Sequence, residues 1–238
     1  ALAVGLSLQS EAQTIYALSS GGLYSFDAAM PETANFNGTI SGITPGQTIE
    51  GIDFRPLNGM LYALGYDRNT QMAQIYTVDV ATAIATPVNI TPISLVLGPV
   101  GVDRLDVTFD FNPTVDRIRV TCNRDYNYRL NPITGAIAFT DINLNYAVAD
   151  VNAGANPYIA TGAYTNSYVG STSTVLYNVD ALLKIVAKQD PPNNGTLNTI
   201  GNLGGAVSKS FSSADMDIFY DAVSQTNKTY LTVNSNLE

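Results

Sequence analysis

The stretch GIDFRPLNGMLYALG, residues 51–65, contains two short strand-forming runs joined by a turn. Pro56 restricts the backbone and cannot donate to a β-ladder, so it ends the first run. A looser copy, FDFNPTVDRIRVT, occupies residues 109–121. A hairpin that recurs in this way indicates a fold built from repeated β-units.

A second marker gives the length of the repeat. It is a strand that ends in an acidic or amide residue, and its last matched positions are spaced 52, 52 and 49 residues apart. The four copies are LYSFD at 23–27, IYTVD at 75–79, YRLNP at 128–132 and LYNVD at 176–180. Alternation in LYxVD places Leu and Val on one face and Tyr on the other, as a strand packed between neighbouring sheets requires. The Asp or Asn caps the turn that follows.

Each unit therefore contains four short antiparallel strands, which we name A (GIDF), B (LYAL), C (LYxVD) and a less uniform D. Four-stranded units that repeat about every 50 residues are typical of a β-propeller. We predict an all-β fold with almost no helix, a β-propeller of about five four-stranded blades. Residues 14–238 form a single domain in this interpretation.

The order of the markers predicts two open ends in the ring. The first marker is a B strand, TIYAL at 14–18, and the last two are an A strand and a B strand, DMDIFYD at 215–221 and TYLTV at 229–233. The last blade is expected to be incomplete by roughly 40 residues if the repeat length is a guide. Because open strand edges invite pairing, we expect residues beyond Glu238 or a neighbouring molecule of a homo-assembly to donate the missing strands.

The composition excludes several classes of function. The chain of 238 residues has no histidine, a single cysteine and a formal charge of −9. It therefore has no imidazole base or ligand and cannot build an internal disulfide, a zinc site or an iron–sulfur site. The 11 basic residues are scattered, so no nucleic-acid partner is expected. No cofactor is predicted, apart from oxygen-ligated Ca²⁺, which this composition can still serve. Cys122 falls in an alternating run, which predicts a buried strand residue.

Residues 1–13, ALAVGLSLQSEAQ, are apolar and small before they turn polar. This pattern matches the back half of a secretory signal peptide, and an ordinary apolar N-terminal strand is the alternative. We expect an exported protein, either secreted or displayed on the cell surface. No segment approaches the roughly 20 apolar residues that cross a bilayer, so no transmembrane segment is predicted.

The motifs GIDFRP…LYALG, FNPTVDRIRV and NAGANP together resemble the bacterial family known as domain of unknown function 4394, found in secreted and surface proteins. The similarity extends from Thr14 to the end of the chain. It implies export and a propeller-like domain, and it brings no catalytic residues because the family has no established activity. One departure is Cys122, where relatives usually carry a small polar residue.

The loop LNYAVADVNAGANPY, residues 144–158, contains the candidate metal ligands. Asp150, Asn152 and Asn156 alternate like the oxygen ligands of a Ca²⁺ loop, and Gly154 permits the tight turn between them. The loop lacks the bidentate Glu that ends a helix–loop–helix calcium loop, so a hydrogen-bonded turn is the alternative. Four tyrosines in or near loops are candidate platforms on which a glycan could stack: Tyr126, Tyr128, Tyr146 and Tyr158.

From these features we predict a non-enzymatic, exported structural or binding module. The alternatives are a ligand-binding or Ca²⁺-binding propeller and a glycan hydrolase or lyase that uses Asp110 and Asp116, because two carboxylates suffice for glycoside hydrolysis. The same hairpin carries the further acidic and basic residues Asp103, Asp106, Arg104, Arg117 and Arg119. We therefore interpret its carboxylates as ion-pair partners and turn caps, and we predict no catalytic residue.

Overall fold

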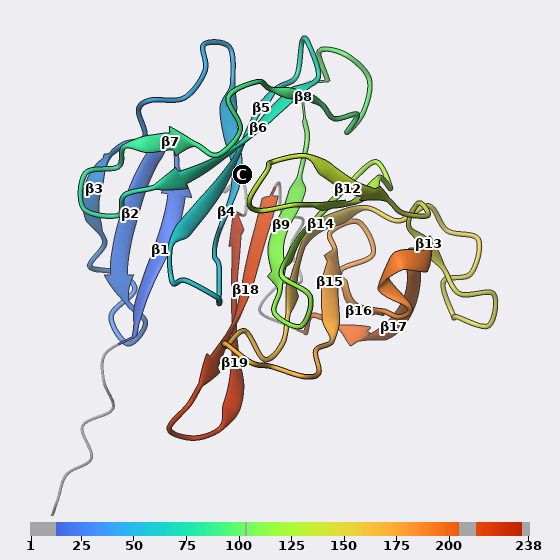
Figure 1. Ribbon diagram of the computed structural model, residues 1–238. Coiled ribbons are helices and arrows are strands. Elements are labelled where there is room, and N and C mark those ends of the chain that lie inside the picture. The colour runs from blue at the N-terminus through green and yellow to red at the C-terminus, as the bar shows by residue number, and fades with distance from the viewer. Residues whose placement is uncertain (1–12, 103, 205–212, 235–238) are drawn as a thin grey trace, which may run out of the picture.

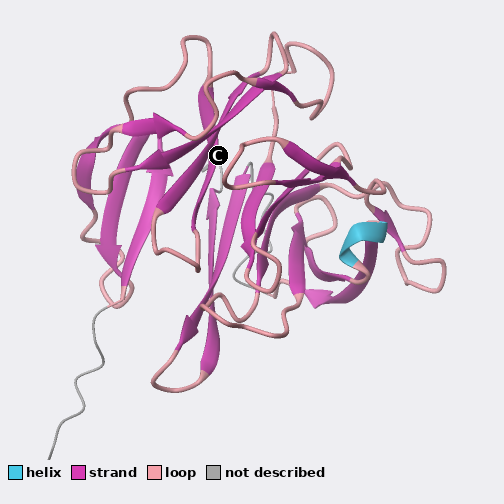
Figure 2. Cartoon of the chain, viewed as in Figure 1, coloured by secondary structure: helices cyan, strands magenta, loops and turns pink. Residues whose placement is uncertain are grey.

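The computed structural model describes residues 13–102, 104–204 and 213–234. The described chain is built from β-strands, and its helical segment is the short 3₁₀ turn η1 (Pro192–Asn194) (Figures 1 and 2). The predicted all-β class is confirmed. Across these residues no helix is long and apolar enough to span a membrane. Residues 1–12, which form most of the expected signal remnant, lie outside the described residues. Asp103 lies outside them as well.

The strands form five sheets in chain order. The first contains β1 (Thr14–Ser19), β2 (Gly22–Asp27) and β3 (Asn35–Thr39). The second contains β4 (Thr48–Phe54), β5 (Leu61–Asp67) and β6 (Met72–Val78), with β7 (Ala85–Pro87) and β8 (Ile93–Ser94) both paired to β6. The third contains β9 (Val107–Asn112), β10 (Arg117–Cys122), β11 (Asn127–Leu130) and β12 (Ile137–Thr140). The fourth contains β14 (Ile159–Tyr164), β15 (Leu176–Asp180), β16 (Ile185–Gln189) and β17 (Thr196–Asn202), with β13 (Asn145–Tyr146) parallel to β17. The last is the hairpin of β18 (Ser213–Asp221) and β19 (Thr226–Asn234).

The first strands of the last four sheets lie side by side near the centre of the molecule (Figure 1). β9 contacts both β4 and β14, and β14 contacts β18, while the later strands of each sheet lead away from this centre. This radial arrangement is that of a propeller. The predicted count of about five blades is not confirmed, because four sheets have three or more strands and the described part of the fifth is a two-stranded hairpin.

The largest hydrophobic cluster lies between the second and third sheets. Its fully buried members include Leu64, Ile75, Phe111, Ile118 and Leu130. Burying one such side chain contributes about 1.5–3 kcal/mol, so the alternating runs of these strands are pressed together. Cys122 belongs to the same cluster, which confirms its predicted burial in a strand.

One strand assignment made from the sequence is wrong. LYNVD at 176–180 was predicted to be a C strand, but β15 is the second strand of its sheet and pairs with β14 and β16. The reason lies in the acidic residue that ends the strand. Asp180 accepts a backbone N–H two residues later, as do Asp67 after the second strand β5 and Asp79 after the third strand β6. The marker identifies a strand that is followed by an Asx turn, whatever its position in the blade.

Candidate functional site

A cavity of about 410 Å³ lies at the centre of the molecule. Its walls come from β1 and from the first strands β4, β9, β14 and β18 of the other sheets. Ile15 and Tyr16 line it from β1, and Met216 and Phe219 line it from β18. The cavity is therefore a shared feature of several sheets and a candidate site for a ligand or a partner segment.

The edge of β1 faces this cavity. Among the described residues β1 pairs with β2 alone, and it touches β4 only slightly. The sequence aligns β1 with the B strands, yet β1 is only half-buried, whereas the second strands β5, β10 and β15 are almost completely buried. In their sheets, β4, β9 and β14 cover these strands. No described strand occupies the corresponding place beside β1.

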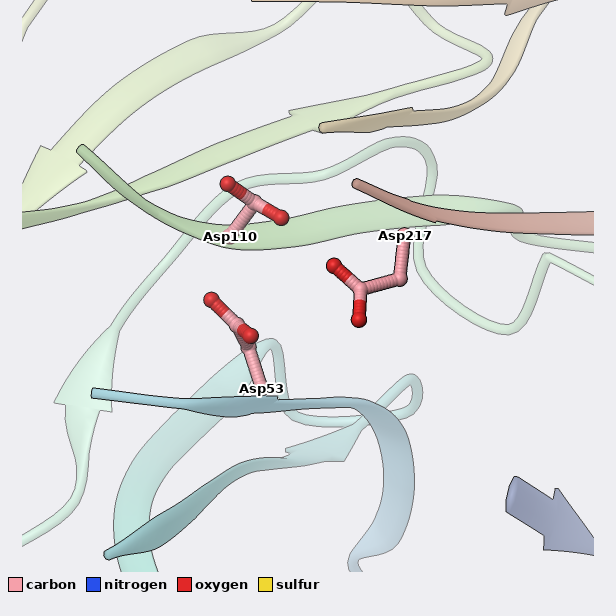
Figure 3. A group of neighbouring side chains, drawn as sticks. All are labelled: Asp53, Asp110 and Asp217. Carbon is pink, nitrogen blue, oxygen red and sulfur yellow. The ribbon is translucent and has the colours of Figure 1, made fainter. Parts of the chain in front are cut away.

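Three carboxylates face one another in this cavity (Figure 3). They belong to Asp53 of β4, Asp110 of β9 and Asp217 of β18, and one oxygen of each lies within 4.8 Å of the other two. All three occupy the same position of the A marker, in the tripeptides IDF, FDF and MDI. Since side chains alternate along a strand, the apolar neighbours face the sheet interfaces and the Asp faces the centre.

Two of these carboxylates hold the next sheet in place. Asp53 Oδ2 accepts the backbone N–H of Phe111 at 2.7 Å, and Asp110 Oδ1 accepts the backbone N–H of Tyr164 at 3.0 Å. Each bond therefore joins an A strand to the A strand of the following sheet. A backbone amide that bonds to a carboxyl oxygen favours the ionised form, and the contact is charge-assisted once that carboxyl is ionised.

The bond between consecutive A strands has a different acceptor at the fourth sheet. Ala163 takes the Asp position there, and the hydroxyl of Thr161, two residues earlier, accepts the N–H of Met216 at 2.9 Å instead. Thr161 also donates to Asp215, at 3.2 Å. The next A-strand carboxylate around the ring is that of Asp217. The strand that would present a backbone amide to it is an A strand beside β1, at the inner edge of the first sheet.

Burial governs the protonation of this cluster. It raises the pKa of Asp110, which is only 6% exposed, well above the usual range, and the charges of Asp53 and Asp217 raise it further. Burial and then the charge of Asp217 likewise raise the pKa of Asp53. Asp217 is exposed to the cavity, but the strands around the cavity still restrict its hydration, and this burial raises the pKa of the carboxyl as well. Neighbouring carboxyls at this distance disfavour ionising together, so the cluster loses its protons at higher pH than isolated carboxyls do.

Such a cluster has three chemical capacities. Its oxygen atoms could ligate a hard cation, its carboxyl groups could serve as an acid and a base, and its oxygen atoms could accept backbone amides. The third capacity is in use at Asp53 and Asp110.

The carboxylates of the hydrolase alternative are not brought together. Asp110 joins the central cluster, whereas Asp116 forms an ion pair with Arg55, with Nε and Oδ1 2.8 Å apart. The interpretation of the hairpin carboxylates as ion-pair partners is confirmed for Asp116 and for Asp106, which pairs with Arg104 at 3.0 Å. It is wrong for Asp110, because the nearby Arg119 is paired with Asp141 at 2.6 Å. Although Arg119 lies opposite Asp110 in the β9–β10 register, Asp110 bonds to the next sheet.

The candidate calcium loop is tied to β17. Asp150 Oδ2 accepts the N–H of Thr199 at 2.6 Å, and its Oδ1 accepts the Thr199 hydroxyl at 2.7 Å and the N–H of Asn152 at 2.8 Å. Asn152 also donates to the Thr199 hydroxyl at 2.9 Å. The amide of Asn156 contacts the carbonyl of Pro157 at 3.4 Å. The loop thus brings Asp150 and Asn152 together at Thr199, and calcium binding stays a prediction.

The four candidate stacking tyrosines lie in different environments. Tyr126 and Tyr128 stack on each other with ring centroids 6.2 Å apart, and Tyr128 is only 6% exposed. Tyr146 is 4% exposed and donates its hydroxyl to Asp180 at 2.8 Å. Tyr158 is half-buried and lies 5.4 Å from the guanidinium of Arg104. The structure does not gather these rings into one surface, and their role in stacking stays a prediction.

Asp53 and Asp217 were missed as site residues. The signal is present in the sequence, because an Asp recurs at one position of the A marker, but a residue that recurs in a repeat is explained equally well by strand structure alone. Radial packing is what brings positions 57 and 107 residues apart into one cluster.

Together the radial sheets and the acidic centre define an all-β protein with a propeller-like arrangement and an open inner position. The chain belongs to the family described as Domain of unknown function (DUF4394), which matches residues 22–238. The family resemblance seen in the sequence motifs is confirmed. No curated protein matches the chain significantly.

Three solved structures are similar in fold at low identity. A glutaminyl cyclase from Myxococcus xanthus has 13% identity and a TM-score of 0.49 over 91% of this chain and 84% of its own. An auxiliary nutrient binding protein from Bacteroides ovatus has 17% identity and a TM-score of 0.47 over 90% of this chain and 51% of its own. A DUF4623 family protein from Bacteroides eggerthii has 12% identity and a TM-score of 0.48 over 93% and 53%. This chain spans about half the length of the last two, and similarities this weak carry no functional argument.

Proposed function

We propose that this chain is an exported, non-enzymatic structural or binding module, a five-bladed propeller whose first blade is completed by an added strand. The observation that carries the proposal is the cavity beside the open edge of β1. Export, with secretion or display on the cell surface, rests on the signal-like residues 1–13 and on the family resemblance.

The contacts of the central carboxylates support a non-enzymatic role. The two that accept backbone amides, Asp53 and Asp110, join neighbouring sheets and so serve the architecture of the ring. A screen for turnover of soluble polysaccharides tests this part, and we expect no activity. Turnover that Asp110→Asn abolishes would replace the proposal with the glycan hydrolase or lyase alternative.

The order of the strands supports a particular type of added strand. In the second, third and fourth sheets the A strands β4, β9 and β14 pair antiparallel with the second strand. We propose that the strand added beside β1 is of this A type. Pairing such a strand with β1 covers the inner edge of the first sheet, which is unpaired among the described residues.

Hydrogen exchange of the full chain tests strand acceptance. We expect those β1 amides that do not bond to β2 to exchange rapidly, and to become protected when a peptide copying residues 48–55, TIEGIDFR, is added. A scrambled peptide of the same composition is the control. Protection of β1 in the monomer without any peptide would contradict the proposal. Head-to-tail assemblies whose size increases with protein concentration would show that the strand comes from another copy.

A further inference from the structure

The second, third and fourth sheets share one register between their first two strands. An aromatic residue of the first strand lies opposite an aliphatic residue of the second in each of them, as Phe54 opposite Leu61, Phe111 opposite Ile118 and Tyr164 opposite Leu176. The alignment of TIYAL with MLYAL places Ile15 at the corresponding position of β1. A strand added beside β1 would therefore place its aromatic residue opposite Ile15.

The backbone amide of this aromatic residue donates a hydrogen bond to the neighbouring sheet. In β9 and β14 it points to the preceding sheet, where a carboxylate of the A strand accepts it. In the ring, the A strand that precedes the first sheet is β18. Its carboxylate at the matching position is Asp217, which lines the cavity next to β1.

The walls around Asp217 suit such a strand. On one side Phe219 of β18 lines the cavity and is 37% exposed, whereas Met216 and Ile218, which flank Asp217, are buried in the core. On the other side Tyr16 of β1 packs edge-on against Phe54 of β4, with ring centroids 5.4 Å apart. An extended segment with alternating apolar side chains meets apolar surface on both sides of the cavity and a carboxylate at its centre.

We propose that Asp217 is the acceptor that positions the added strand, by taking the backbone N–H of the aromatic residue opposite Ile15. This inference rests on the proposed strand addition and deepens it, because it names the register and the chemistry of the partner. The partner is an A-type strand in which the Asp-position residue lies opposite Tyr16 and an aromatic residue follows it. The bond repeats the contacts that Asp53 and Asp110 make to Phe111 and Tyr164.

A double-mutant cycle on the full chain tests the bond. The probe is the fluorescein-labelled peptide TIEGIDFR, with or without a methyl group on the backbone nitrogen of its Phe, and binding is measured by fluorescence anisotropy. Against the parent protein, we expect the methyl group to weaken binding by about tenfold or more, because it removes the N–H donor and leaves a buried acceptor without its partner. Against Asp217→Ala we expect a loss below about threefold, because the acceptor is already absent.

Asp217→Asn is the matched control, since it keeps an oxygen acceptor of similar size at the same place and should restore most of the methyl effect. Equal losses in the parent and in Asp217→Ala would overturn the role of Asp217 while leaving strand acceptance intact. If the unmethylated peptide binds neither the parent nor Asp217→Asn, strand acceptance itself fails and the inference fails with it.

Discussion

Replacing Asp110 with Asn should stabilise the protein at mildly alkaline pH. Asn keeps a carbonyl oxygen that can accept the N–H of Tyr164, and it has nearly the same volume as Asp. The substitution removes an ionisable group from one of the least exposed positions of the cluster. The bond between the third and fourth sheets is thereby kept, while the unfavourable burial of a charge is removed.

The sign and size of the effect follow from proton linkage. Burial raises the pKa of Asp110, so between the ordinary pKa and the raised one the folded protein holds more protons than the unfolded chain. The contribution of the Asp110 carboxyl to the free energy of unfolding is then fully present below the ordinary pKa, and it is lost as pH rises through the raised pKa. One extra proton corresponds to a loss of about 1.4 kcal/mol per pH unit. Asp110→Asn should therefore make the slope of stability against pH shallower by up to about 1.4 kcal/mol per unit.

Urea unfolding followed by circular dichroism at about pH 5 to about pH 8 measures this slope. Asp79→Asn is the control, because the backbone amides of Thr82 and Ala81 hold the pKa of exposed Asp79 below its usual range. Its stabilising contribution is present above the ordinary pKa and lost as pH falls, so Asp79→Asn should destabilise at neutral pH. A variant Asp110→Asn that is less stable than the parent at about pH 8, or that has an unchanged slope, would refute the reasoning.

Three further predictions concern other parts of the chain. Arg119→Ala should destabilise by about 3 kcal/mol or more in urea unfolding, because Arg119 is 1% exposed and its loss removes the donors to Asn127, Asn193 and Asp141, of which only Asp141 keeps a second ion pair, with Arg129; a loss below about 1 kcal/mol would contradict this. Burial raises the pKa of Cys122 to about 11, so a thiol reagent should label the native protein far more slowly than the urea-unfolded chain, and equal rates would show that the thiol is accessible. Asp150→Asn should lower the melting temperature with or without Ca²⁺, because Asp150 ties its loop to Thr199; a Ca²⁺-dependent rise in the parent that the variant loses would instead support a calcium site.

Local chemistry made most of the strands and turns predictable. The alternation in TIYAL, MLYAL and RIRVT corresponds to β1, β5 and β10, and the acidic residues that end strands cap turns as expected. These features depend on neighbours in the chain, and a single segment shows them. The same locality explains the error at LYNVD, because an Asx turn follows the second strand of one blade as well as the third strand of another.

The sequence by itself determined the all-β class, the repeating hairpins and the family. The tertiary structure decided which strand faces the centre and what meets there. Asp53, Asp110 and Asp217 lie far apart in the chain, and only the radial packing of their sheets brings their oxygen atoms within 4.8 Å. The same packing decides that Asp110 bonds to Tyr164 and leaves Arg119 to Asp141. Strand alternation selects the face on which a side chain lies, but the neighbour across that face depends on how separate sheets are placed in space.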